Sequence, residues 1–126
     1  MSLDSLAATA AAAERAADGE VVLPAYERLF EAAIETREME VAADALRGLS
    51  RAYQQRHRLE EAAELAELSL HIAEGTGCSR AAARALNTLA VIRFLEHDAG
   101  AAGSLYAAAR ERATDCGDDA LIGWSC

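Results

Sequence analysis

The chain has 126 residues and a formal net charge of −9 at pH 7. This length fits one domain with a modest hydrophobic core. The acidic balance disfavours a nucleic-acid-binding protein, because binding to phosphates needs a cationic surface that displaces their counterions.

The residue usage predicts an all-α protein. The sequence contains 32 alanines and one proline. Alanine is the best intrinsic helix former, and Val and Ile never alternate with polar residues over the length of a strand. All twelve basic residues are Arg, which together with the alanine excess indicates a GC-rich, bacterial genome.

The sequence also predicts a cytoplasmic protein with no membrane partner. No apolar run approaches the roughly 18 residues that a membrane span needs. Residues 1–20 lack the positive start of a secretory signal, since Asp4 lies there. Cys78, Cys116 and Cys126 form an odd, sparse set that suits reduced thiols better than a disulfide framework.

Glycine and acidic clusters punctuate the chain, and helical patterns lie between them. Asp or Ser near the starts and Gly near the ends of these patterns fit the preferences of helix caps. Pro24 then falls in the first turn of the second helix, where proline is tolerated. The predicted helices cover residues 3–17, 23–36, 40–56, 60–74, 79–96 and 100–114, and a seventh begins near 119.

The stretches "ALRGLS" at 45–50 and "ALNTLA" at 85–90 show that the sequence repeats every 40 residues. Small residues at shared positions allow close helix crossings, and large ones fill holes, as stacked helical hairpins require. Equivalent residues under this shift include Leu6, Leu46 and Leu86, then His57 and His97, then Tyr26, Ala66 and Tyr106, then Gly77 and Gly117. The predicted hairpin units are 3–36, 40–75 and 80–115, and residues 119–126 begin a truncated fourth.

The repeats resemble the tetratricopeptide repeat family. "LSRAY" at 49–53, followed by Ala62 and Ser69, has the family's leucine, small residues and aromatic. The third unit matches through Leu89, Ala90, Ala102, Tyr106 and Ala109. The first unit departs at Thr9, where a leucine is expected, and the period exceeds the family's usual 34 residues. The resemblance covers nearly the whole chain and implies a right-handed α-solenoid of three hairpins plus the start of a fourth.

This resemblance implies a non-catalytic protein-interaction or scaffold module that binds a peptide or partner protein in a concave groove. The long period is also similar to the repeat arrays in large bacterial signalling proteins. The alternative function is therefore an N-terminal regulatory segment of a larger signalling enzyme or transcription regulator. A repeat of this kind indicates the architecture of a protein better than it indicates which ligand the protein binds.

In this family the first helix of each hairpin lines the groove. Arginine suits bidentate recognition of carboxylates, and amide side chains can hydrogen-bond an extended peptide backbone, so we expect a protein or acidic-peptide partner. The first unit offers only Asp4 and alanines at these positions, which departs from a complete carboxylate clamp. The expected groove residues are Arg47, Arg51, Gln54, Gln55, Arg84, Asn87, Thr88, Val91 and Phe94. The alternative is that these arginines pair with acidic residues of adjacent helices, such as Glu14 or Glu96.

The sequence predicts no catalytic residues, no metal site and no cofactor. His57, His71 and His97 lack the spacing of metal ligands with the cysteines. Cys78 and Cys116 lie in glycine-bearing links that we interpret as exposed, and no activating base has a sequence signature.

The sequence also allows predictions for two other surfaces, one on a glutamate-rich helix and one at the C-terminal end. Glu60, Glu64 and Glu67 share one side of a helix, which we interpret as a solvated outer face rather than a binding site. The truncated fourth unit leaves the last complete hairpin without a neighbour, and Trp124 would lack partners. We therefore expect self-association through the C-terminal end, at 105–126.

Overall fold

The computed structural model describes residues 2–16 and 19–115. This part of the chain is all-helical, which confirms the predicted all-α class, and it contains no helix long and apolar enough to cross a membrane. The predicted seventh helix and fourth unit lie outside the described residues. The six helices are α1 Leu3–Ala16, α2 Gly19–Glu35, α3 Met39–Gln55, α4 Leu59–Thr76, α5 Ser79–Leu95 and α6 Ala99–Asp115.

The predicted helix boundaries agree with the structure to within two residues, apart from the start of α2. The sequence predicted that start at residue 23, with Pro24 in the first turn, and this is wrong because α2 begins at Gly19. Proline lacks an amide hydrogen and crowds the carbonyl four residues before it. So close to the helix start, the loss is confined to the bond that Pro24 would donate to Glu20.

The turns between helices repeat every 20 residues. Each turn places a residue in the left-handed region, as in a Schellman cap. The four residues are Arg37 (φ 60°), His57 (φ 60°), Gly77 (φ 74°) and His97 (φ 65°). The amide that follows each one donates to a carbonyl five residues earlier: Glu38 to Ala33 (2.9 Å), Arg58 to Tyr53 (3.0 Å), Cys78 to Ala73 (3.1 Å) and Asp98 to Arg93 (2.9 Å). The 40-residue sequence period therefore corresponds to two equal helix-and-turn steps of the backbone.

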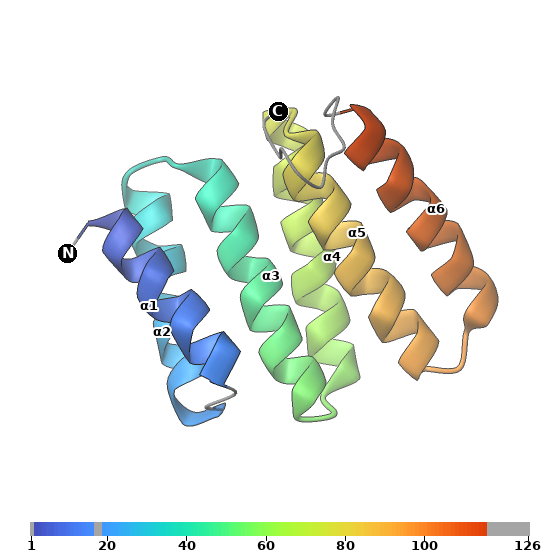
Figure 1. The fold of residues 1–126 in the computed structure, drawn as a ribbon, viewed down its shortest axis with the longest axis horizontal. Coiled ribbons are helices and arrows are strands. Elements are labelled where there is room, and N and C mark those ends of the chain that lie inside the picture. The colour runs from blue at the N-terminus through green and yellow to red at the C-terminus, as the bar shows by residue number, and fades with distance from the viewer. Residues whose placement is uncertain (1, 17–18, 116–126) are drawn as a thin grey trace.

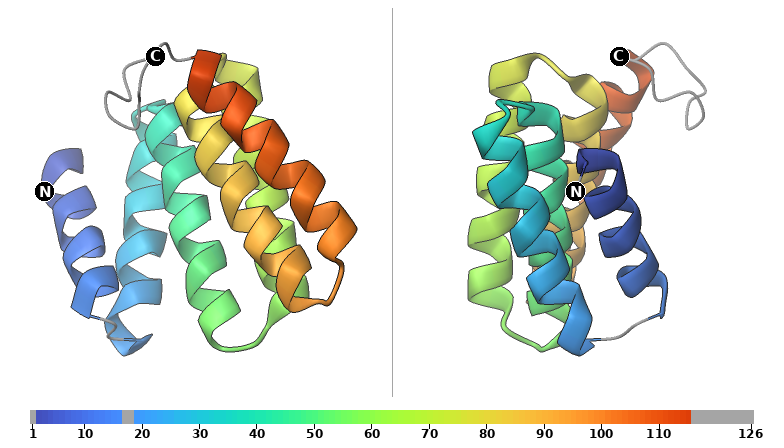
Figure 2. Two further views of the ribbon diagram at one scale, coloured as in Figure 1. Left: turned by 45° about the vertical axis from the view of Figure 1, so that its right-hand side comes forward. Right: turned by 90° about the vertical axis from the view of Figure 1, so that its left-hand side faces the viewer.

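Consecutive helices pack against each other along the chain, and α3 also packs against α5. In Figure 1, α2 and α4 lie behind α1, α3 and α5, and α6 forms the right-hand end. The right-hand view of Figure 2 shows α2 and α4 on one side of the molecule, with α1 on the other. Among the described residues, α1 packs on α2 and has no comparable packing on α3.

Close helix crossings depend on small residues in the core. A β-carbon added at Gly48 of α3 would lie 2.4 Å from ring atoms of Tyr26, so glycine permits α2 to approach α3. Within the second hairpin, the buried hydroxyl of Ser50 donates to the Ala62 carbonyl, and that of Ser69 donates to the Ala43 carbonyl, both at 2.6 Å. These bonds fix α3 against α4 without leaving the hydroxyls unsatisfied.

Candidate functional site

Eight of the nine predicted groove residues line two clefts on the side of α1, α3 and α5. The larger, which we call the ionic cleft, has a volume of about 560 Å³. It is lined by Ala7, Ala11, Glu14, Arg15, Tyr26, Leu29, Asp44, Arg47, Arg51, Gln55 and Arg84. The smaller, the amide cleft, has a volume of about 220 Å³ and is lined by Arg51, Gln54, Asn87, Thr88 and Val91. Arg51 belongs to both clefts.

Glu14, near the end of α1, is the carboxylate that faces α3. The Tyr26 hydroxyl donates to its Oε1 at 2.6 Å. Its Oε1 lies 3.9 Å from Nη2 of Arg47, and its Oε2 lies 3.5 Å from Nη1 of Arg51. The Oε2 atom is buried and has no hydrogen-bond partner among the described residues. Glu14 therefore links three helices through one firm hydrogen bond and two longer ionic contacts.

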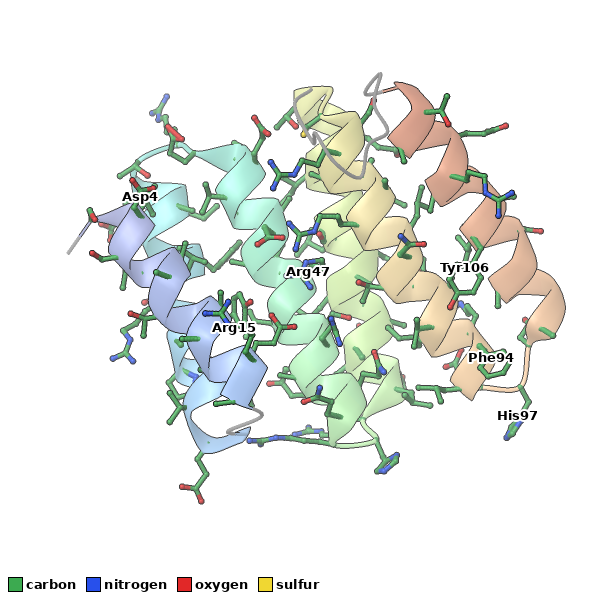
Figure 3. All side chains as sticks on the ribbon, in the orientation of Figure 1. Asp4, Arg15, Arg47, Phe94, His97 and Tyr106 are labelled. Carbon is green, nitrogen blue, oxygen red and sulfur yellow. The ribbon has the colours of Figure 1, made fainter. Side chains whose placement is uncertain are left out.

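Asp44 of α3 lies closer to two of the arginines, Arg47 and Arg84, than Glu14 does to its own arginine partners. Nε of Arg47 donates to Asp44 Oδ1 at 2.9 Å, and Nη1 of Arg84 lies 3.2 Å from the same oxygen. Together with Glu14, these contacts form an ionic chain that runs from α1 through α3 to α5. Figure 3 shows Arg47 at the centre of this side of the molecule, with Arg15 on the neighbouring α1.

The environment shifts the pKa values of three groups in the ionic cleft. Burial raises the pKa of Tyr26 to about 12, and its hydrogen bond to Glu14 adds to this effect. Burial opposes the charge of Arg47, but Asp44 and Glu14 outweigh it and raise the pKa. Burial lowers the pKa of Arg84; Asp44 opposes this change, while Arg47 and Arg80 add to it. The positive charge of Arg84 is thus disfavoured by burial and by the charges of Arg47 and Arg80.

The three predicted arginines converge on one cleft, and each is already paired with a carboxylate. The alternative expectation of pairing with Glu14 is confirmed for Arg47 and Arg51, whereas Glu96 pairs with Arg93 instead. Arg47 lies buried rather than on a solvated face. Phe94, which is 62% exposed, lines neither cleft and lies at the α5–α6 end of the molecule.

Two partners that organise the ionic cleft, Tyr26 and Asp44, were not among the residues predicted for the groove. One signal was available for Tyr26, because a glycine inside a helical pattern, here Gly48, often marks a close approach of another element. Asp44 lies three residues before Arg47, a spacing at which helical side chains meet.

Cys78 is buried, so the interpretation of an exposed link cysteine is wrong. It caps α5, where its sulfur accepts a hydrogen bond from the Ala81 amide at 3.4 Å, and its thiol donates to Glu40 at 3.1 Å. These contacts turn the side chain inward. Within the described ranges, no group of three or more histidine, cysteine or acidic side chains could hold a metal ion.

Comparisons with known proteins give no assignment: no family model matches the chain, and neither a curated protein nor a solved structure matches it.

Proposed function

We propose that the chain is a non-catalytic protein-interaction module, a right-handed α-solenoid of three tetratricopeptide-like hairpins. It binds a peptide or partner protein on the side formed by α1, α3 and α5. The observation that carries this proposal is the placement of eight predicted groove residues around two clefts that share Arg51. The four turns of similar geometry at 20-residue intervals support the stacking of hairpins.

The amide cleft supplies the contacts for a peptide. Gln54 and Asn87 can each donate to and accept from an extended backbone, and Val91 provides apolar contact. The half-exposed Arg51 guanidinium lies where the two clefts join. In the ionic cleft, the shifts at Tyr26 and Arg47 move titration away from neutral pH, which suits binding better than proton transfer. The sparse cysteines suit a reducing compartment, and we propose the cytoplasm as that compartment.

Selection from a random dodecapeptide display library on the whole chain tests this function. Synthetic copies of enriched peptides would be titrated by fluorescence anisotropy. We expect Arg51→Ala to weaken binding by about tenfold or more, as truncation of an interface arginine commonly does. Circular dichroism should show nearly unchanged helicity, because a half-exposed ion pair contributes little to stability.

Arg110→Ala is the matched control, since Arg110 is an exposed arginine of α6 that lines neither cleft. It should leave peptide affinity unchanged. Failure to enrich any peptide, or equal affinities for wild type and Arg51→Ala, would contradict the proposed function.

A further inference from the structure

We propose that Glu14 occupies the place of a ligand carboxylate in the ionic cleft, so that the cleft binds acidic ligands by exchanging one carboxylate for another. This inference rests on the proposed function and specifies its ligand chemistry. The shared chemistry is a carboxylate group, which an acidic peptide or a free dicarboxylate can supply.

The charges around the ionic cleft leave room for an additional anion. Four arginines line it, namely Arg15, Arg47, Arg51 and Arg84, against the two carboxylates of Glu14 and Asp44. The cleft is therefore cationic in a chain whose net charge is −9. Burial lowers the pKa of Arg84, and the nearby Arg47 and Arg80 lower it further, although Asp44 acts in the opposite direction. An anion bound beside Arg84 would offset that repulsion.

The two carboxylates of the ionic cleft are held differently. Asp44 accepts a direct hydrogen bond from Arg47 at 2.9 Å and lies 3.2 Å from Arg84. Glu14 is 3.9 Å from Arg47 and 3.5 Å from Arg51, and its Oε2 has no hydrogen bond to any described residue. A buried oxygen without a hydrogen bond is unfavourable. The one short hydrogen bond to Glu14 comes from the Tyr26 hydroxyl at 2.6 Å, and a ligand carboxylate could accept that bond in its place. Because its contacts with the arginines are longer than those of Asp44, Glu14 is the carboxylate that we expect a ligand to replace.

A ligand can reach Arg51, the arginine that now pairs with Glu14 and would pair with the ligand carboxylate instead. The Arg51 side chain is 48% exposed, whereas that of Glu14 is 21% exposed. The ionic cleft, at about 560 Å³, lies in the size range of small-ligand sites. Because Glu14 lies in the last turn of α1, its side chain can turn away while α1 keeps its packing on α2.

A purely structural role for Glu14 makes a different prediction. If Glu14 only ties α1 to α3, removing its charge would loosen α1 and create no affinity for anions. If Glu14 stands in for a ligand, removing its charge leaves Arg51 without its partner and strengthens the binding of an external carboxylate. The affinity for an acidic probe separates these two roles.

The experiment compares wild type, Glu14→Gln and Glu31→Gln as whole chains at low salt. Glu31 is an exposed glutamate of α2 that lines neither cleft, so its variant has the same change in net charge. The probes are glutarate and acetylated tetraglutamate, titrated by calorimetry, with NMR detection of the arginine Nε–H signals. Tyr26→Phe provides a second route, because it removes the hydroxyl that anchors Glu14 and leaves the carboxylate in place.

We expect Glu14→Gln to bind at least one probe about fivefold more tightly or better, as residues that share an ionic network commonly show couplings of this size. Tyr26→Phe should bind the same probe more tightly than wild type, and Glu31→Gln should match wild type. Preference for glutarate identifies a free dicarboxylate as the ligand, and preference for tetraglutamate identifies a peptide.

Equal gains in Glu14→Gln and Glu31→Gln would overturn the exchange, since the effect would then be one of overall charge. An unchanged or weaker affinity in Glu14→Gln would overturn it as well. Peptides from the display selection that depend on Arg51 would still support the proposed function in that case. Conversely, a gain in Glu14→Gln for glutarate with no enriched peptide would retain the exchange and reject the peptide-binding function.

Discussion

At the scale of single residues, Gly48 and Tyr26 depend on each other. The buried Tyr26 ring lies against Gly48, where a β-carbon would be 2.4 Å from ring atoms. Its hydroxyl donates to Glu14 at 2.6 Å, so moving the ring aside would disturb this hydrogen bond. Gly48 thereby positions the residue that anchors Glu14 in the ionic cleft.

Gly48→Ala should lower the free energy of unfolding by about 1–2 kcal/mol, because the cost of overpacking exceeds the gain in helix propensity. Gly103→Ala is the matched control, since a β-carbon at Gly103 of α6 would meet nothing within 4 Å. It should raise stability by up to about 1 kcal/mol. Urea unfolding of both variants measures these changes in the free energy of unfolding. A stabilised Gly48→Ala variant would show that the contact with Tyr26 is not tight.

The raised pKa of Tyr26 predicts a loss of stability in alkali. In the folded protein the pKa of Tyr26 is about 12, whereas an unfolded tyrosine has its ordinary pKa of 10.0. The contribution of the protonated Tyr26 hydroxyl to the free energy of unfolding is present below pH 10 and is lost as the pH rises toward 12. It is on the order of 2 kcal/mol. Urea unfolding between pH 9 and 12 should show a smaller decline in Tyr26→Phe, and equal declines in both proteins would contradict this prediction.

The sequence predicted some residues of the ionic cleft but not how deeply they are buried. Helical spacing placed Arg47 and Arg51 on the same polar side of α3, and both do line the ionic cleft. It could not indicate that Arg47 is buried, because that depends on Glu14 and Tyr26 from another hairpin. Contacts between residues distant in sequence leave no trace in the periodicity of one helix.

At the scale of elements, the turns share one backbone geometry with different residues. Gly77 has the positive φ that glycine adopts freely, whereas His57 and His97 adopt φ values of 60° and 65° at equivalent positions. A non-glycine residue in this region costs about 1 kcal/mol or more. The histidines are exposed, so no buried contact compensates for this cost.

His57→Gly and His97→Gly should each raise the free energy of unfolding by about 0.5–1 kcal/mol, because glycine removes the strain of the left-handed conformation. Gly77→Ala should lower it by about 1 kcal/mol for the converse reason. Thermal unfolding at neutral pH measures all three variants. Destabilised histidine variants would indicate that the imidazole rings make stabilising contacts.

Helix boundaries were the most predictable feature of the elements. Positions near the turns, such as His57, His97 and Gly77, recur under the 40-residue shift, so local sequence defines where helices end. The start of α2 was missed because Pro24 was taken as a marker of the first turn, although a helix can begin several residues before a proline.

At the scale of the whole molecule, the two ends of the described structure differ. Tyr26 is 3% exposed because α3 covers it, whereas its repeat equivalent Tyr106 is 43% exposed. Phe94 and Leu95, at the end of α5, are also exposed, and Figure 3 shows Phe94 at the α5–α6 end. At the α1 end, Thr9 replaces the leucine of later repeats. The α5–α6 end therefore exposes two aromatic side chains, Phe94 and Tyr106.

We expect the protein to self-associate through the α5–α6 end, since exposed apolar patches commonly mark interaction surfaces. Sedimentation velocity should show a sedimentation coefficient that rises with concentration. The double variant Phe94→Ser with Tyr106→Ser should shift this association to higher concentration, while Ile34→Ser, at a separate exposed residue of α2, should not. A wild-type protein that stays monomeric at millimolar concentration would contradict the prediction.

The central claim is that ligands bind on the side of α1, α3 and α5, around Arg51. The most direct measurement is an NMR titration of the labelled chain with a peptide from the display selection, following every backbone amide. We expect the largest shifts at Arg51, Asn87 and Val91, with little change on the outer faces of α2 and α4. Shifts concentrated at Glu31 of α2 and Glu64 of α4, exposed residues that line neither cleft, would contradict it.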